Sequence, residues 1–328
     1  MRISIRGLLA FGALFTALAG AQEAAFLVGE KINGSVGFYA ADGKRLGGVR
    51  VGEHPHELIL SPDGKHAYIT DNGILWMTYA GPGGNTVSII DIAAREKAGV
   101  IDLGDNRRPH GIDVDKKTGH LIVTTENPDG LLLIDPVARK ILRKYDVRGS
   151  APHMAILDAG AEWAYVSNTN SNAIAAIQMK TGEAKVIPTG PGPQGCVFSH
   201  DGKLLYVTNG RGSSIAIVDT AKKERIGEIP TGKTPVRIAL TPDGKTLVYA
   251  LQDGEAVGFA DIATRKEVHQ VALTGRPLSL TTSRDGKLAY AAVQDQDKIF
   301  EISVPDRKLL RVIQIPRGLG PDPVIPLR

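Results

Sequence analysis

Three histidines follow prolines at similar intervals along the 328-residue chain. They are His56, His110 and His153, and the same offset after later prolines holds Gln194, Val236, Leu278 and Asp322. Neutral imidazoles that converge from neighbouring strands can bind zinc, copper, iron or nickel, hold a polar or anionic ligand, or exchange protons near neutral pH. The pattern therefore leaves open a ligand site, a divalent-metal site, or a repeat in which each ring bonds only to backbone or water.

The prolines themselves mark a repeat. They are Pro55, Pro109, Pro152, Pro193, Pro235 and Pro277, at spacings of 54, 43, 41, 42 and 42 residues. Apolar runs alternate with Asp-Gly turns, and Asp-Gly favours the positive φ of a tight hairpin. A period in the low forties with four strands per repeat is typical of β-propeller blades. An antiparallel sandwich is the alternative, and six aligned prolines argue against it.

One strand of the repeat carries a family signature. Tyr206-Val207-Thr208-Asn209 is the namesake sequence of the YVTN β-propeller repeats, and the Pro-Asp-Gly-Lys turn seen at 62–65 is their usual companion. Over residues 25–328 the chain resembles this family. The resemblance implies an all-β fold, a seven-bladed β-propeller with four-stranded blades. It implies little about function, because such propellers serve many roles.

The two ends of the chain are expected to share one blade. The runs AFLVGE, SVGFYA and RLGGVRV, within 25–51, look like strands two to four of a blade without a first strand. Residues 320–323 resemble the start of a blade, and VIPLR at 324–328 then supplies a first strand. We expect the last blade to be closed by the N- and C-terminal strands, which removes two free sheet edges.

Residues 1–21 have the features of a secretory signal peptide. Two arginines precede a short apolar run, and Ala19-Gly20-Ala21 fits the small-x-small cleavage pattern. The apolar run is shorter than the ~20 residues that span a bilayer. We therefore expect residues 22–328 to be a single β-propeller domain, periplasmic or secreted, with no transmembrane segment in the mature chain.

Charge and composition exclude several classes of function. The formal net charge is only +4 and no basic block is present, so no nucleic-acid partner is expected. No Ser-His-Asp triad, phosphate loop, dinucleotide fingerprint or haem-attachment motif is visible. The lone cysteine, Cys196, cannot form an intramolecular disulfide, and its place in a predicted inner strand indicates a buried, inert thiol.

The first complete repeat contains about 12 extra residues, because its spacing is 54 where the others approach 42. They fall at 73–84, between the second and third strands. The propeller resemblance implies that this loop and the Pro-His motifs lie on one face, where propellers commonly bind ligands. Long loops often cover binding sites, so Trp76, Met77 and Tyr79 are candidates to cover the mouth of the channel. Packing of the loop onto its own blade is the alternative.

Charged and amide residues beside the motifs complete the candidate binding set, with surface salt bridges as the alternative for the charged members. They are Glu57, Arg108, Glu126, Gln194, Arg237 and Arg276. Glu126 is expected in a loop on the face of His110, and the arginines could bind anions. The remaining histidines near predicted turns or outer strands, namely His66, His120, His200 and His269, are interpreted as solvated.

A second resemblance is local. Arg108-Pro109-His110-Gly111-Ile112, followed by Thr124-Thr125-Glu126-Asn127, resembles the Pro-His-Gly-Ile and Thr-Glu motifs of the streptogramin lyase propellers. Those are metal-dependent enzymes that use histidine and glutamate at the channel mouth. Only this repeat matches, and Val123-Thr124 replaces the aromatic residue that normally precedes the Thr-Glu. The propeller lactonases are another relative by fold.

The sequence therefore predicts an exported propeller that binds a small ligand or a protein partner at a channel mouth bearing His56, His110 and His153. The alternative is a metal-dependent lyase or lactonase-like hydrolase that uses the same histidines. A divalent metal is the candidate cofactor.

Overall fold

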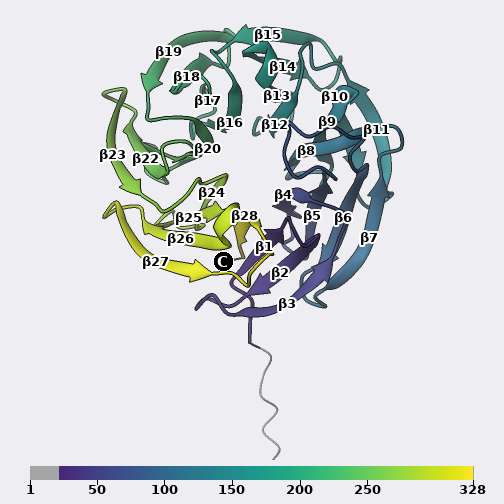
Figure 1. Ribbon diagram of the computed structural model, residues 1–328. Helices are drawn as coiled ribbons and strands as arrows, with labels where there is room; N and C mark the ends of the chain where they lie inside the picture. Colours follow the sequence, from purple (N-terminus) through teal and green to yellow (C-terminus); the bar gives the residue numbers. More distant parts are fainter. Residues whose placement is uncertain (1–21, 328) are drawn as a thin grey trace, which may run out of the picture.

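The computed structural model describes residues 22–327, so the predicted signal peptide lies outside the described residues. Within this range the strands β1 to β28 form seven four-stranded antiparallel sheets, arranged as blades around a central axis (Figure 1). The two short 3-10 helices are η1 (Thr169–Ser171) and η2 (Gln294–Gln296). In the part of the chain so described, no helix is long and apolar enough to cross a membrane. The predicted all-β, seven-bladed propeller is confirmed.

Six blades are contiguous in sequence, each with its innermost strand first (Figure 1). Blade one comprises β4 (Pro55–Leu60), β5 (His66–Asp71), β6 (Thr86–Asp91) and β7 (Glu96–Asp102). Blade two comprises β8 (Arg107–Val114), β9 (Leu121–Asn127), β10 (Asp129–Asp135) and β11 (Lys140–Tyr145). Blade three comprises β12 (Pro152–Leu157), β13 (Trp163–Asn168), β14 (Ala173–Gln178) and β15 (Ala184–Pro188).

The next three blades repeat this order. Blade four comprises β16 (Pro193–Phe198), β17 (Leu204–Asn209), β18 (Ser214–Asp219) and β19 (Glu224–Pro230). Blade five comprises β20 (Pro235–Leu240), β21 (Thr246–Leu251), β22 (Ala256–Asp261) and β23 (Lys266–Ala272). Blade six comprises β24 (Ser279–Thr282), β25 (Leu288–Val293), β26 (Lys298–Ser303) and β27 (Lys308–Gln314).

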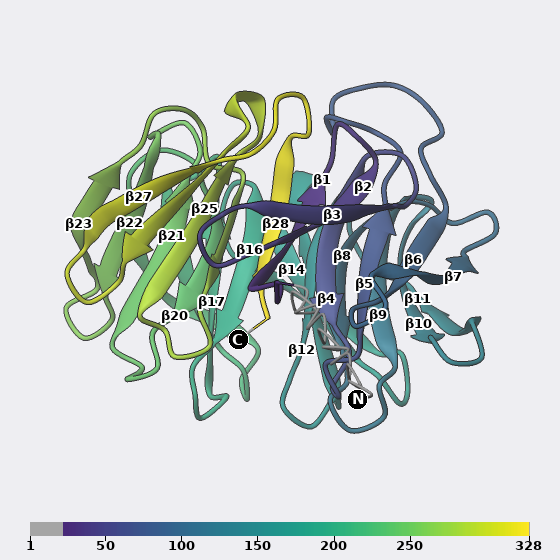
Figure 2. The same ribbon diagram turned by 90° about the horizontal axis from the view of Figure 1, so that it is seen from below.

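Blade seven joins the two ends of the chain, as expected. It runs in the order β28 (Pro321–Pro326), β1 (Phe26–Glu30), β2 (Ser35–Tyr39) and β3 (Arg45–Arg50). Phe26 pairs with Pro326 and Val28 with Val324. Figure 2 shows β28 beside β1. Val28 and Val324 are fully buried in a core shared with Tyr290 of blade six, so closure also packs the last blade onto its neighbour.

The hydrophobic cores lie between blades, which explains the unbroken apolar runs of the second strands. In β17, Leu205 and Val207 pack against blade three, whereas Tyr206 between them packs against blade five. Successive side chains of a strand point to opposite faces, and here both faces are buried by a neighbouring sheet. The Tyr-Val-Thr-Asn sequence is therefore a strand buried on both sides.

Candidate functional site

The innermost strands carry a β-bulge directly after the motif proline. Strand register shifts between Pro55 and Leu58 in blade one and between Pro109 and Ile112 in blade two. The same shift occurs in blades three, four and five. A bulge leaves residues unpaired and redirects their side chains. This places Glu57 and Arg237, one residue beyond the histidine offset, beside the axis as well, although strict alternation would turn them away.

Threonines of the second strands hold the bulges in register between blades. The Thr70 hydroxyl accepts a hydrogen bond from the Glu57 amide at 3.0 Å and donates one to the His110 carbonyl at 2.9 Å. The Thr124 hydroxyl accepts from the Gly111 amide at 2.8 Å and donates to the His153 carbonyl at 2.8 Å. Each threonine thus joins its own innermost strand to the next one, which sets the relative heights of the three histidines.

The three histidine rings lie in one stack. The His110 ring is in the middle, with ring centroids 4.0 Å from His56 and 4.1 Å from His153. All three residues are buried, with exposed fractions of 9%, 0% and 4% for His56, His110 and His153. The expectation that adjacent innermost strands bring these side chains together is confirmed in position.

Burial is the main cause of the lowered pKa of all three imidazoles. The positive charges of Lys31 and Arg237 lower each pKa further. The rings are therefore neutral near pH 7, and each offers one nitrogen lone pair. Nδ1 of His56, Nε2 of His110 and Nδ1 of His153 are buried without a hydrogen-bond partner among residues 22–327.

His110, the middle ring of the stack, is also bonded to a carboxylate. Nδ1 of His110 lies 2.7 Å from Oε1 of Glu126, whose other oxygen lies 3.1 Å from Nε of Arg108. Burial raises the pKa of Glu126 to about 7, against the opposing charge of Arg108. Glu126 is at the end of β9 and not in a loop, which corrects the sequence expectation. The strand runs on because the β9–β10 connection is tight, with Glu126 paired to Asp129.

Two further ion pairs lie beside the histidine stack. A guanidinium nitrogen of Arg237 bonds to Oε1 of Glu57, and burial raises the pKa of Glu57 although Arg237 opposes the shift. Nζ of Lys31 lies 3.2 Å from Oδ2 of Asp322, and the same oxygen is 3.5 Å from Nδ1 of His56.

Lys31 and Asp322 were not among the candidate residues. Asp322 occupies the histidine offset of blade seven, and Lys31 follows the second strand of that blade on the same face. The topology of the closing blade was therefore a signal that could have found both.

A cavity of about 200 Å³ opens on this face, and we call it the mouth cavity. Its polar lining consists of Lys31, His56, Asn72, Thr78, His153, Gln194, Arg237, Gln252 and Asp322. Its apolar lining consists of Ile74, Leu75, Trp76, Met77, Val236 and Leu278. The insertion at 73–84 therefore contributes part of the lining, including Trp76 and Met77.

Six candidate residues lie outside the mouth cavity, among them Glu57 and Arg108, which pair with Arg237 and Glu126. Tyr79 is 54% exposed and is not in the lining. Arg276 pairs with Asp253 at 2.5 Å on the surface. His110, the middle ring of the stack, and Glu126 do not line the cavity.

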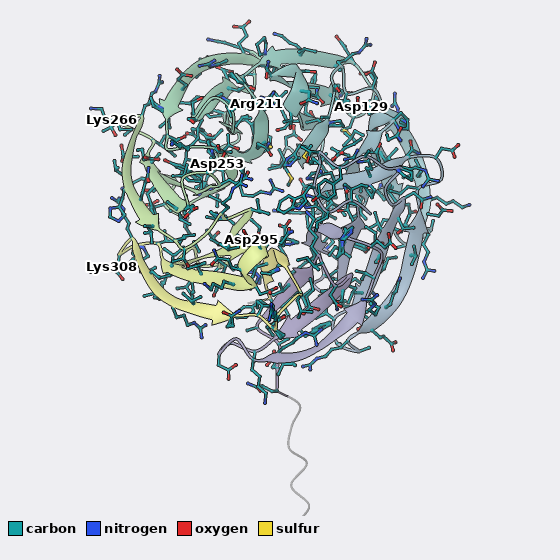
Figure 3. The ribbon with its side chains drawn as sticks, in the orientation of Figure 1. Asp129, Arg211, Asp253, Lys266, Asp295 and Lys308 are labelled. Atoms are coloured by element: carbon teal, nitrogen blue, oxygen red, sulfur yellow. The ribbon has the colours of Figure 1, made fainter. Side chains whose placement is uncertain are left out.

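Figure 3 looks along the axis onto the disc and labels several of the surrounding charges. Arg211, Asp253 and Asp295 come from connections between second and third strands, whereas Asp129 is the first residue of β10. Lys266 and Lys308 project from the outer edge.

A second, smaller cavity of about 160 Å³ is lined by Glu57, Arg237 and Cys196, among others. Burial raises the pKa of the Cys196 thiol to about 12. The reactive thiolate is therefore scarce at neutral pH, in keeping with the expected inert cysteine, although Cys196 is only partly buried.

No family model matches the chain, and no curated protein matches it. Among solved structures it is similar to Kuenenia stuttgartiensis hydrazine synthase, with 19% identity and a TM-score of 0.70 over 82% of this chain and 88% of that one. A functionally unknown protein from Desulfotomaculum acetoxidans DSM 771 has 13% identity and a TM-score of 0.75 over 93% and 99%. Dihydro-heme d1 dehydrogenase NirN, in complex with DHE, has 14% identity and a TM-score of 0.65 over 90% and 64%. At these identities the likeness shows the propeller fold alone, and membership of the YVTN family stays a prediction.

Proposed function

We propose that this chain is an exported YVTN-type propeller that binds a small ligand in the mouth cavity. The observation that carries the proposal is the cavity itself, with an apolar wall that includes Trp76 and convergent polar groups that include His56 and His153. Concave sites with apolar walls and a few placed polar groups are the usual form of small-molecule sites. The NirN structure in complex with DHE supports the idea that a protein with a similar fold can hold such a ligand.

The lining limits the ligand. At about 200 Å³ the mouth cavity is smaller than the ~300–1,000 Å³ of drug-sized pockets, so a compact molecule fits it best. One side of that molecule would pack against Trp76, and polar atoms on the other would bond to Gln194 and the imidazoles. A protein partner is the weaker alternative, because the cavity is small and part of its lining comes from the insertion.

A metal-dependent lyase or lactonase-like hydrolase is the second candidate function. The observation in its favour is the His110–Glu126 pair, because a group with a pKa of about 7 can give and take protons near neutral pH. His110 does not line the mouth cavity, however, so a proton would reach a substrate only through a neighbouring ring. Ligand binding therefore ranks first.

Binding is tested by titrating the chain with a library of small polar molecules in a calorimeter. His153→Gln changes the lining of the mouth cavity, whereas His120→Gln makes the same substitution away from it. We expect at least one compound to bind wild type and His120→Gln equally and His153→Gln at least tenfold more weakly. Binding that is unaffected by His153→Gln and by Trp76→Ala would place the site elsewhere.

Export is tested separately. Sequencing the N-terminus of the protein recovered from a secreting host should give Gln22 as the first residue. Recovery of an intact Met1 from the cytoplasm alone would contradict export.

A further inference from the structure

We propose that His56, Glu57 and His110 form a binding site for a divalent transition metal such as Zn²⁺. One ligand atom from each of these residues lies within 4.8 Å of the other two. The inference goes beyond ligand binding, because it concerns a bound ion and adds Glu57 and His110, which do not line the mouth cavity, to His56, which does.

The spacing of the donors is close to what a metal requires. Nδ1 of His56 and Oε1 of Glu57 are 3.8 Å apart. In a tetrahedral zinc site with bonds of about 2.0–2.1 Å, ligand atoms lie about 3.4 Å from one another. A shift of about 1 Å or less in each side chain would bring these three donors into range of one ion and leave the fourth tetrahedral position open, and the bulge already directs all three residues to the axis.

Unpartnered nitrogens support this site independently. Nδ1 of His56 and Nε2 of His110 are buried and have no hydrogen-bond partner among the described residues. Buried polar atoms are almost always hydrogen-bonded, so an exception calls for an explanation such as a bound ion. A metal bound by both nitrogens, at the edges of the two rings, would satisfy them.

Glu126 sets the orientation of the His110 ring. It bonds to Nδ1 at 2.7 Å, which leaves Nε2 directed away from Glu126. Histidines that bind metals commonly donate their other ring N–H to a carboxylate, and that contact fixes the tautomer and raises the basicity of the ligating nitrogen. Arg108, 3.1 Å from the second oxygen of Glu126, holds the carboxylate in place.

The donor set indicates the class of metal. Two neutral imidazoles and one carboxylate suit zinc, copper, nickel or iron, whereas calcium and magnesium prefer oxygen donors throughout. Oε1 of Glu57 lies 3.8 Å from Nδ1 of His56 and also accepts from Arg237, so metal binding by Oε1 would move the Arg237 hydrogen bond to Oε2. His153 is not in this cluster, because it lies on the far side of His110. The structure thus groups Glu57, and not His153, with the other two histidines.

The test uses the full chain, purified without a histidine tag and stripped with EDTA. Titration with Co²⁺, followed by its visible absorption, reports coordination geometry, and elemental analysis after Zn²⁺ loading and dialysis reports stoichiometry. We expect one metal per chain. His56→Gln and Glu57→Gln should each weaken Co²⁺ binding at least tenfold, and Glu126→Gln should weaken it by about 10–100-fold through the orientation of His110.

Two matched controls test whether metal binding depends on histidines outside the proposed site. His153→Gln alters the same stack outside the cluster, and His120→Gln alters a histidine far from it; both should bind Co²⁺ like wild type. Should His110→Gln fail to fold, His56→Gln and Glu57→Gln still decide the question. Folded wild type that binds no Co²⁺ or Zn²⁺, or variants of His56 and Glu57 that bind like wild type, would overturn the metal site.

The ligand titration is repeated on stripped and metal-loaded protein. A compound that binds stripped protein, when no metal binds, would overturn the metal site and leave the proposed function standing. A chain that binds metal but none of the compounds would support the metal site and contradict the proposed function.

Discussion

Glu57 and Arg237 are 180 positions apart in the sequence and form an ion pair across the axis, between the innermost strands of blades one and five. Each side chain is only 10% exposed. Arg237 lines the mouth cavity, and both residues line the smaller cavity beneath it. Arg237 is therefore shared by the linings of the two cavities.

Removing one partner of this pair should destabilise the fold by an amount that depends on which partner is removed. Arg237→Met leaves Glu57, which can take up a proton because burial already raises its pKa. Glu57→Leu leaves a guanidinium that cannot lose its charge, so we expect it to cost more, about 3–5 kcal/mol of unfolding free energy. The double variant should cost clearly less than the sum. Urea unfolding in EDTA measures all three, and strictly additive costs would argue against a coupled pair.

Closure of blade seven should depend on Val324. It is fully buried against Val28, so Val324→Ala removes two methyl groups from a core and should cost about 2 kcal/mol. Val137→Ala is the matched control, because Val137 is 91% exposed and its loss should stay within about 0.5 kcal/mol. Thermal unfolding compares the two variants. Equal melting temperatures for both would mean that β28 contributes little to the ring.

Trp76 should report occupancy of the mouth. It lines the mouth cavity, whereas Trp163 begins β13 and its ring lies 3.6 Å from Nζ of Lys223. Cu²⁺ quenches nearby indole fluorescence, so Trp163→Phe should retain a saturable response to Cu²⁺ and Trp76→Phe should lose it. Identical quenching in the two variants would show that the insertion does not cover the bound ion.

Asp113 should make stability depend on pH. Its carboxylate accepts hydrogen bonds from the amides of Val114 and Leu157, both at 2.8 Å, yet burial raises its pKa to about 6. The folded state then binds the proton more tightly than the unfolded state. Stability from this group is complete below about pH 4 and is lost as pH rises to about 6, by at most about 3 kcal/mol.

Asp113→Asn cannot titrate, so the difference in unfolding free energy between wild type and this variant isolates the effect. We expect wild type to lose stability relative to the variant between pH 4 and pH 7 in urea titrations. A difference that stays constant over this range would show that the pKa of Asp113 is not raised.

Most of the fold and part of the site could be predicted from the sequence repeat. Prolines at a period near 42 predict blades, and equal offsets in adjacent blades predict that the histidines meet. The bulge is not visible in such a pattern, so the sequence placed Glu57 and Arg237 only beside the motifs and not opposite each other. Closure of the last blade was predicted, but strand order alone does not show that the side chains of Lys31 and Asp322 meet. Arg276 and Tyr79 share the face but point into solvent, which depends on loop conformation and not on period.

The pairing of Phe26 with Pro326 also governs the order in which the disc can be completed. During synthesis β1, β2 and β3 emerge first, but their innermost partner, β28, emerges after the six other blades. Until then the inner edge of β1 has unpaired backbone groups that another strand could pair with. The nascent chain must therefore keep this edge from foreign strands throughout elongation, and the cavities at the axis take their final shape only when Asp322 arrives.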